Sequence, residues 1–257
     1  MSLQSEFASI ALDAGRAALV TVVRSPGEPR VGAKLLVRAD GAASGSLGEE
    51  ALDQAARADA EELIWIERSE LREHGEVTLF VDVTAPPPRL VVFGAVDFAA
   101  ALCRVARAAG WRPYVVDPRS RFATRERFPD AEDVLAEWPA EAIAHLGGID
   151  RATYLAVLTH DPKLDDAALL TALDSDTPYI GAMGSRRAQA KRRERLVAAG
   201  VTDAQLERVA APIGLDLGGT SAEETAVSIM GELIAVRNGR EGGRLSASKG
   251  RIHEVGA

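Results

Sequence analysis

The sequence predicts an α/β protein in which a smaller α+β domain precedes a doubly wound parallel sheet. Three observations support this fold class. Apolar runs alternate with helical stretches over residues 89–237, which is typical of a parallel sheet whose strands are joined by helices. Residues 89–119 contain a strand, a glycine turn, a helix and a second strand in succession. The stiff segment 85–88, Ala-Pro-Pro-Pro, is the expected linker between this half and residues 1–84.

The strand, turn, helix and strand of residues 89–119 form the clearest element. A short apolar run breaks at Gly94, apolar residues then recur at helical spacing until Gly110, and a second apolar run stops at Asp117. A glycine turn lets backbone N–H groups approach a phosphate, the helix start favours negative charge, and the acid can accept hydrogen bonds from a ribose. The stretch therefore predicts a nucleotide-type site that includes Gly94, Ala95 and Asp117.

Two positions in this stretch depart from the dinucleotide-binding pattern. Val96 and Ala99 stand where that pattern has its second and third glycines. The branched side chain of Val96 falls where a pyrophosphate would approach the backbone. Two interpretations of the turn stay open, namely a site for NAD(P) and a structural turn without a ligand.

The N-terminal domain, residues 1–84, is expected to combine strands and helices. Apolar spacing predicts a short helix before residue 15 and a second helix from about Glu49. Asp40-Gly41 predicts a hairpin turn. The expected strands are residues 17–24, 31–38 and 77–83, whereas residues 64–66 fit either a strand or the end of the second helix.

The C-terminal domain, residues 89–237, continues the alternation. We expect further strands at residues 133–138, 153–159 and 179–182, and further helices at residues 141–146, 164–173, 187–199 and 222–236. Thr202-Asp-Ala-Gln205 and Ser221-Ala-Glu-Glu224 are capping boxes, which begin helices. Residues 238–257 are polar and glycine-rich, and we expect them to be disordered.

The loops after the strands are the candidate site, because ligands of a doubly wound sheet bind beyond the carboxyl ends of its strands. In one loop Asp117 is followed by Arg119, and an acid suits a ribose hydroxyl whereas an arginine suits a phosphate. Another loop contains Thr159, His160 and Asp161. His160 beside Asp161 fits either proton transfer or simple hydrogen bonding within the loop, and no third ligand at useful spacing indicates a metal site.

The loop from Gly181 to Arg187 is the strongest candidate for binding an anion. Gly181, Gly184, Ser185, Arg186 and Arg187 stand at the expected start of a helix, where backbone amides, the helix dipole and guanidinium groups can converge on one anion. Six of the ten residues from 186 to 195 are basic, although the net charge of the chain is -8. The alternative for such a charge run is a solvated helix face.

The composition argues against several classes of function. A net charge of -8 argues against general nucleic-acid binding, which usually needs a basic face. The single cysteine, Cys103, falls on the apolar side of a helix, so we expect a buried thiol, no disulfide within the chain and no cysteine-based metal site. No apolar stretch approaches about 18 residues and the N-terminal segment lacks a signal-peptide pattern, so we expect no membrane partner and a cytoplasmic location.

A series of motifs runs in order from about Ala17 to Val236. It comprises TVV, PRVGAKLLVRADG, GSLGEEALD, VVFGAVDFAAAL, VVDPRSRFATRERFP, LTHDPKLDDAALLTAL, YIGAMGSRRAQAKRRERL and PIGLDLGGTSAEETAVSI. Together these motifs resemble the XdhC/CoxI family of xanthine dehydrogenase accessory factors, whose members join an N-terminal domain to a C-terminal Rossmann-like domain. The resemblance implies a maturation factor that binds molybdenum cofactor (molybdopterin), keeps it during sulfuration and delivers it to xanthine dehydrogenase or a related molybdenum hydroxylase.

The chain departs from this family at two places. Members often carry a cysteine after the hairpin, implicated in holding or sulfurating the cofactor, where this chain has Gly48-Glu49-Glu50-Ala51. A second common cysteine is missing near His74-Gly75. The part of the cofactor that remains for this chain to hold is its terminal phosphate, and the expected phosphate ligands are Gly184, Ser185, Arg186 and the Gly94 turn.

We therefore expect a cofactor-binding chaperone that is not itself a catalyst, and the sequence leaves its status as an enzyme open. The partners implied are the client hydroxylase and a cysteine desulfurase. A homodimer is expected as well, since small domains with exposed strand edges tend to pair. Two other hypotheses are an NAD(P)-binding oxidoreductase of small molecules and a binding protein whose Rossmann-like domain supplies only an interface.

Overall fold

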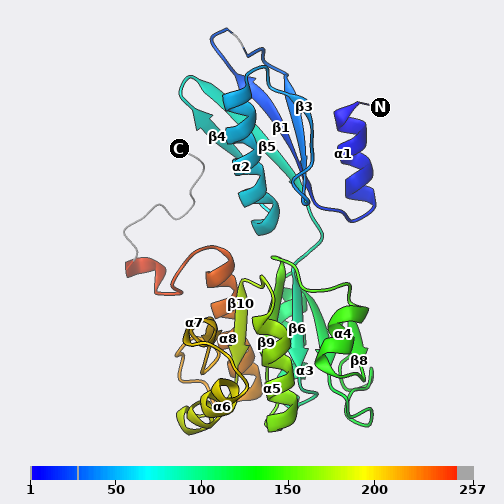
Figure 1. The fold of residues 1–257 in the computed structure, drawn as a ribbon, viewed down its shortest axis with the longest axis vertical. Coiled ribbons are helices and arrows are strands. Elements are labelled where there is room, and N and C mark those ends of the chain that lie inside the picture. Colours follow the sequence, from blue (N-terminus) through cyan, green and yellow to red (C-terminus); the bar gives the residue numbers. More distant parts are fainter. Residues whose placement is uncertain (1, 28, 248–257) are drawn as a thin grey trace. The chain divides into compact units, whose positions relative to one another are not determined.

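The computed structural model describes residues 2–27 and 29–247 of the chain (Figure 1). The chain divides into two compact units, each with apolar clusters of its own. The first unit contains Met1–Pro87 and, among the described residues further on, 244–247, and the second is Pro88–Gly243. The division falls inside the proline segment 85–88. The tail expected to be disordered, residues 238–257, is described in part. Residues 238–247 include a 3-10 helix at Leu245–Ala247, contrary to that expectation, and residues 248–257 lie outside the described residues.

A five-stranded antiparallel sheet forms the first unit. Its strands lie in the order β3, β2, β1, β5, β4. Their bounds are Ala17–Arg24 (β1), Lys34–Arg38 (β2), Ala43–Ser46 (β3), Glu70–His74 (β4) and Val77–Thr84 (β5). The hairpin predicted from Asp40-Gly41 is confirmed, because these residues form the turn between β2 and β3 and Gly41 has a φ of +83° there.

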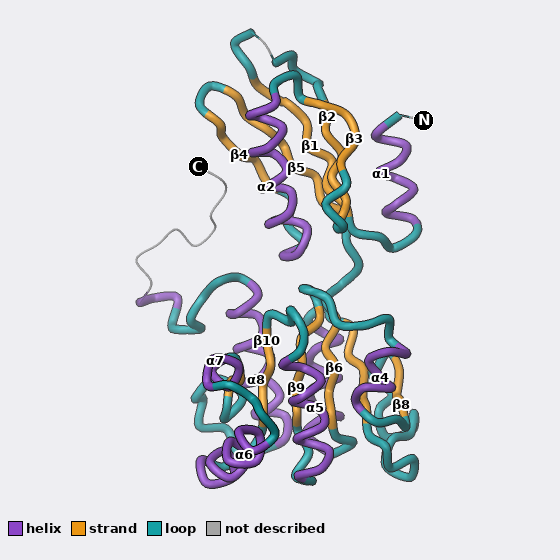
Figure 2. Tube along the Cα trace, viewed as in Figure 1, coloured by secondary structure: helices purple, strands orange, loops and turns teal. Residues whose placement is uncertain are grey.

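Two helices pack against this sheet (Figure 2). Helix α2 (Glu50–Ile66) buries Leu63 and Ile64 against alternate residues of β1, β2 and β5. Helix α1 (Leu3–Leu12) packs against a separate cluster that contains Leu19 and Leu36. Successive side chains of a strand point to opposite faces, so the two clusters lie on the two sides of the sheet. Residues 64–66, which fit either a strand or the end of the second helix, continue the helix.

A six-stranded parallel sheet forms the second unit. Its strands are Arg89–Phe93 (β6), Arg112–Val116 (β7), Asp133–Leu135 (β8), Thr153–Val157 (β9), Tyr179–Ala182 (β10) and Val209–Ala210 (β11). They lie in the order β11, β10, β9, β6, β7, β8, and every pairing is parallel. Counted within the unit, this is the order 6-5-4-1-2-3 of a doubly wound, dinucleotide-type sheet. The predicted fold class is confirmed.

Helices cover both faces of this sheet. Helices α3 (Asp97–Ala108) and α8 (Ala222–Arg237) share one apolar cluster with β6, β7 and β9. The other cluster joins the opposite sides of these strands to α4 (Pro139–His145), α5 (Pro162–Leu173) and α6 (Arg186–Ala198), and α5 crosses in front of the sheet in Figure 1. Both predicted capping boxes are present, at the starts of α7 (Asp203–Glu207) and α8.

Three strands had no counterpart among the sequence-based expectations. β4 reads Glu-Leu-Arg-Glu-His and lies at an edge of the sheet, where charged side chains discourage pairing with other chains. β3 consists of small residues and β11 has only two residues, so neither carries an apolar pattern. Three expected strands are shorter than predicted: β2 begins at Lys34, β9 ends at Val157, and β8 ends at Leu135 so that Trp138 becomes the N-cap of α4.

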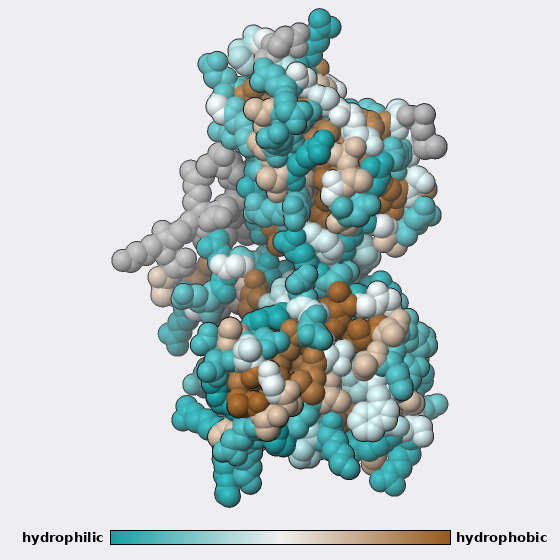
Figure 3. Space-filling view, viewed as in Figure 1, coloured by the Kyte–Doolittle hydropathy of each residue, from teal (hydrophilic) through white to brown (hydrophobic). Residues whose placement is uncertain are grey.

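Hydrophilic side chains cover most of the surface visible in Figure 3. Large apolar side chains that are exposed occur in both units; examples are Val23, Val31, Val197 and Val227. Among the described residues, no helix has both the length and the apolar composition that crossing a lipid bilayer requires.

Candidate functional site

The carboxyl ends of the parallel strands meet at one edge of the second sheet, and the chain reverses its winding between β6 and β9. Gly94 follows β6 and Thr159 lies just beyond β9. Gly94 has a φ of +114°, and a Cβ there would lie 2.9 Å from the backbone nitrogen of Thr159. Only glycine fits this close approach without strain. The sequence-predicted turn thus lies at the switch point, where ligands of such sheets bind.

Asp117, at the end of β7, lies beside this turn and is fully buried. Its Oδ2 accepts the N–H of Ala95 at 2.9 Å and Nη2 of Arg119 at 2.7 Å. Its Oδ1 accepts the backbone N–H and Nε of Arg119 at 3.0 and 2.9 Å. Burial alone would raise the pKa of Asp117, but these hydrogen bonds outweigh it and hold the pKa below its ordinary value. The carboxylate is charged, and its acceptor positions are occupied.

The glycine turn consequently offers few donors to a phosphate. The N–H of Ala95 is bound to Asp117, and the N–H of Val96 donates to the carbonyl of Gly94 at 2.9 Å. Asp97, the first residue of α3, adds a carboxylate whose side chain is 95% exposed, and negative charge there repels an anion. The structure therefore presents the Gly94 turn as an ordered, internally bonded element.

The start of α6 differs from the start of α3 in the charge of its first side chains, which are basic instead of acidic; at α3 the N–H groups of Asp97 and Phe98 likewise have no acceptor among the described residues. Gly184 has a φ of +132°, and Ser185 caps the helix by accepting the N–H of Ala188. The backbone N–H groups of Arg186 and Arg187 have no acceptor among the described residues. Both of their side chains are exposed and form no ion pair with a described residue. Free amides at a helix N-terminus, with two free guanidinium groups beside them, favour an anion.

Two side chains that were not among the predicted site residues donate hydrogen bonds to the backbone carbonyls of this loop. Arg192 is 5% exposed, and its Nη2 donates to the carbonyl of Met183 at 2.9 Å. Gln189 donates its Nε2 to the carbonyls of Ala182 at 3.2 Å and Gly184 at 3.1 Å. Arg192 lies within a run of basic residues that form a single charge pattern in the sequence, and only tertiary packing distinguishes it from its exposed neighbours.

Arg192 is paired with a second buried group, Asp165 of α5. Nη2 of Arg192 lies 2.6 Å from Oδ2 of Asp165, while Oδ1 of Asp165 and Nε of Arg192 have no partner among the described residues. Burial raises the pKa of Asp165, and the hydrogen bond from Arg192 offsets part of that effect. This ion pair joins α5 to α6 immediately below the β10–α6 loop.

The remaining predicted residues have structural contacts. Gly181 lies against Ile213, because a Cβ at Gly181 would overlap that side chain. The hydroxyl of Thr159 accepts the N–H of Asp161 at 2.9 Å, and Asp161 caps α5 by accepting the N–H of Lys163 at 2.9 Å. His160 is exposed and forms no hydrogen bond to a described residue. The site residues thus form one cluster around the Gly94 turn and another at the start of α6.

No described group of side chains offers a metal site: among the described residues, His, Cys, Asp and Glu nowhere gather in a set of three that could hold an ion. Cys103 is buried in the apolar cluster between α3 and α8. Burial, with a smaller contribution from Asp130, raises the pKa of its thiol to about 12. The thiol is therefore neutral and inaccessible, as the sequence predicted.

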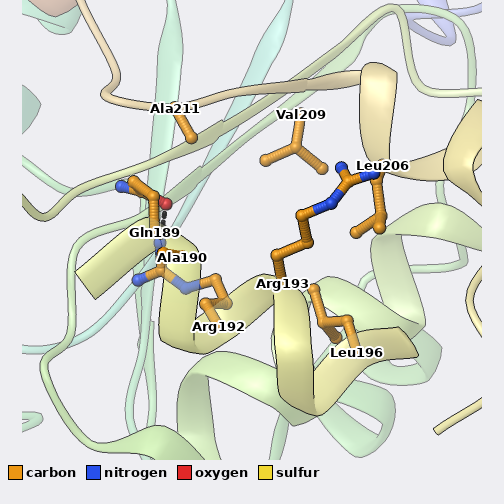
Figure 4. Close-up of a pocket in the computed structure, with 8 residues that line it drawn as sticks. All are labelled: Gln189, Ala190, Arg192, Arg193, Leu196, Leu206, Val209 and Ala211. Atoms are coloured by element: carbon orange, nitrogen blue, oxygen red, sulfur yellow. Dashed lines mark hydrogen bonds between the residues drawn. The ribbon is translucent and has the colours of Figure 1, made fainter. Parts of the chain in front are cut away.

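A pocket of about 270 Å³ opens between α6, α7 and β11 (Figure 4). Its walls include the apolar side chains of Leu196, Leu206 and Val209. Gln189 and Arg192 hydrogen-bond to each other at one end of it, and Arg193 forms an ion pair with Asp203. The polar groups that line the pocket are thus largely engaged with the protein, and it presents a mainly apolar surface.

The chain matches two family models. Residues 90–233 match the XdhC Rossmann domain, and residues 11–75 match the XdhC and CoxI family. These two regions correspond to the two units of the structure.

Three curated proteins are similar to the chain. The uncharacterized protein YqeB of Escherichia coli is 25% identical over 242 residues, which are 88% of this chain and 44% of that protein. A protein of Bacillus subtilis named as a probable xanthine dehydrogenase component is 28% identical over 159 residues, 62% of this chain and 46% of that protein. The molybdenum cofactor insertion chaperone PaoD of Escherichia coli is 26% identical over 152 residues, 59% of this chain and 41% of that protein. The chain spans less than half the length of each.

A solved structure of a xanthine dehydrogenase from Bacillus halodurans has the same fold. Its TM-score is 0.64 at 22% sequence identity, and the match covers 92% of this chain and 66% of that chain. The resemblance seen in the motifs is thus confirmed by the family models and the names of the relatives. Because the Rossmann model alone matches more than half of its residues, the chain belongs to the XdhC and CoxI family.

Proposed function

We propose that this protein binds molybdenum cofactor and delivers it to a xanthine dehydrogenase or a related molybdenum hydroxylase. The family supports this role, as do relatives named for xanthine dehydrogenase and for molybdenum cofactor insertion. The observation that carries the site is the start of α6, where the amides of Arg186 and Arg187 have no acceptor among the described residues and both guanidinium groups are free.

The cofactor is the cargo of this reaction, and its terminal phosphate is the part that fits the chain. A phosphate at the start of α6 would accept the two free N–H groups and would lie within reach of the two guanidinium groups. Gly184 suits this position because its φ of +132° is rarely adopted by other residues. Arg192 and Gln189 fix the loop by binding its carbonyl oxygens, so the donors are ordered before the phosphate arrives.

The metal end of the cofactor finds no thiolate in this chain. Cys103 is the single cysteine, and its thiol is buried and neutral. In our proposal the protein therefore holds the cargo through its anionic tail and leaves the metal end with the ligands that it brings. A chain that does not ligate the metal is suited to release the cargo intact.

The experiment compares the double variant Arg186→Ala/Arg187→Ala with wild type, using the full chain loaded with molybdenum cofactor. Two measurements are made, namely the amount of cofactor retained after gel filtration and the activity gained by an apo molybdenum hydroxylase mixed with the loaded protein. We expect the double variant to retain less than about a tenth of the wild-type cofactor, since two charge-assisted interactions are lost.

Two matched controls separate this site from general charge effects. Lys191→Ala removes an exposed positive charge from the same helix, and Arg57→Ala removes one from the first unit. Both should retain cofactor as wild type does. The proposal fails if wild type retains no cofactor, or if Lys191→Ala lowers retention as much as the double variant.

A further inference from the structure

The loop between β7 and β8 concentrates guanidinium groups around one aromatic ring. Three arginines lie over the ring of Phe122: the Cζ atoms of Arg119, Arg121 and Arg127 are 4.9, 4.5 and 5.8 Å from its centroid. Phe122 itself packs against the apolar cluster under α3. A ring fixed in this way holds the guanidinium planes by stacking and by cation–π attraction.

Two of these arginines are anchored and the third is free. Arg119 is held by Asp117, yet its side chain is 43% exposed and has donors to spare. Arg127 donates to the carbonyls of Ala95 and Phe122, each at 3.0 Å. Arg121 is exposed, and its contact with Phe122 is the one interaction that it forms with the described residues. Its five N–H donors therefore face solvent beside those of Arg119.

The position of this loop in the sheet indicates which part of a nucleotide would lie beside the three arginines. In the strand order observed here, the end of the second strand of the unit is where the ribose of the adenosine half of a dinucleotide lies, and an acid there accepts the 2′-hydroxyl. That acid is Asp117, whose two oxygens already accept four hydrogen bonds. A ribose with free hydroxyls would find no acceptor, whereas a 2′-phosphate would find donors.

We infer that the β7–β8 loop is a binding site for a nucleotide whose ribose carries a phosphate monoester, with Arg119 and Arg121 as the phosphate ligands. Several carboxylates stand near the cluster. Asp117 is paired with Arg119, and the charges of Asp117 and Asp161 both raise the pKa of Arg119. Asp97 forms an ion pair with Arg127 at 3.3 Å, and Glu126 is hydrogen-bonded to its own backbone and to Thr124. Neither forms an ion pair with Arg119 or Arg121 among the described contacts, so the charge of Arg121 stays uncompensated.

This site is separate from the one proposed at α6. β7 and β10 are three strands apart in the sheet, which corresponds to about 14 Å between the two loops. One phosphate cannot bind both loops at once. The inference therefore concerns a second site, and its failure would leave the proposed delivery of cofactor unaffected.

Isothermal titration calorimetry of the full chain tests the site with two probes, 2′,5′-ADP and 5′-AMP. They share the base, the ribose and the 5′-phosphate, and differ in the 2′-phosphate alone. We expect 2′,5′-ADP to bind at least about tenfold more tightly than 5′-AMP, and Arg121→Ala to remove most of that preference. Among the described residues, Arg121 forms no hydrogen bond or ion pair and only stacks on Phe122, so the variant should fold normally.

Arg186→Ala/Arg187→Ala is the control for location, because it removes the anion donors at α6 and leaves the β7–β8 loop unchanged. It should bind 2′,5′-ADP as wild type does. Equal affinity for the two probes, no binding of 2′,5′-ADP, or loss of 2′,5′-ADP binding in the α6 double variant with retention in Arg121→Ala would each overturn the inference.

Discussion

The carboxylate of Asp117 binds the N–H of Ala95, 22 residues earlier in the chain, at 2.9 Å. This bond joins the end of β7 to the turn after β6. The side chain of Arg119 donates to both oxygens of the same carboxylate. The acid that would receive a ribose in a dinucleotide-binding protein here holds the turn together.

Replacing Asp117 by Asn should destabilise the second unit by about 2–4 kcal/mol, because an amide cannot accept four hydrogen bonds and would place its own donors against those of Ala95 and Arg119. Urea unfolding followed by tryptophan fluorescence in a Trp65→Phe background reports on that unit, since Trp111 and Trp138 both lie in it. Asp97→Asn is the control, and should change stability by less than about 0.5 kcal/mol because its side chain is 95% exposed. Equal effects of the two substitutions would contradict the assigned role.

The same carboxylate makes stability depend on pH in acid. The folded-state pKa of Asp117 lies below its ordinary value, so its contribution is fully present above the unfolded pKa of about 3.9 and is lost as the pH falls through the lower folded value. Urea midpoints of wild type and Asp117→Asn should therefore converge as the pH is lowered below the unfolded value. A constant difference between them at every pH would show that the carboxylate is not the group responsible.

Gly94→Ala should be much more damaging than Gly110→Ala. Both glycines have positive φ, +114° and +81°, so each substitution carries a backbone cost of about 1 kcal/mol. At Gly94 the new methyl group also meets Thr159 at 2.9 Å, whereas nothing lies within 4 Å at Gly110. We expect a loss of more than about 3 kcal/mol for Gly94→Ala in the same unfolding assay. If Gly110→Ala costs as much, the close approach of the two loops has no energetic effect.

Breaking the buried pair of Arg192 and Asp165 on one side should cost about 3–5 kcal/mol, because the remaining charge is left buried without its partner. The double variant Arg192→Leu/Asp165→Leu should cost less than the sum of the two single leucine variants. Arg193→Ala breaks an exposed pair in the same helix and should cost less than about 1 kcal/mol. Additive effects of the two buried substitutions would argue against the pair acting as a unit.

Cys103 should resist thiol reagents in the folded protein. Its pKa of about 12 leaves almost no thiolate near neutral pH, and its side chain is fully buried. A colorimetric disulfide reagent should react slowly with native protein and at once after unfolding in guanidinium. Fast reaction of the native protein would instead indicate that the cluster between α3 and α8 opens readily.

The long elements of the second unit could be predicted from the sequence because each has a strong local signal. The helix from residue 97 and the strand from residue 153 have clear apolar patterns, and both capping boxes begin helices. β4 and β11 could not be predicted in this way. The first is a charged edge strand, and the second has two residues that extend only because β10 is beside them.

The loops that form the candidate site could be predicted from the sequence, whereas the hydrogen bonds within them could be predicted only in part. Strand ends and glycines locate the loops, so Gly94 and Gly184 could be chosen from spacing alone. Local sequence does not tell which donors are already used. Asp117 is saturated by a backbone N–H from 22 residues away, and Arg192 differs from Arg193 only in what packs against it. Both facts depend on tertiary contacts.

Helix α8 closes the apolar side of α3, since Ile229, Met230 and Leu233 lie in the same cluster as Leu102 and Ala106. During translation α8 is synthesised long after α3, because five of the six strands of the second unit lie between them in the chain. The apolar side of α3 therefore remains exposed to solvent until synthesis of the second unit is almost finished. A nascent chain that stalls before Ser221 would expose that surface and would become a target for holding chaperones and proteases.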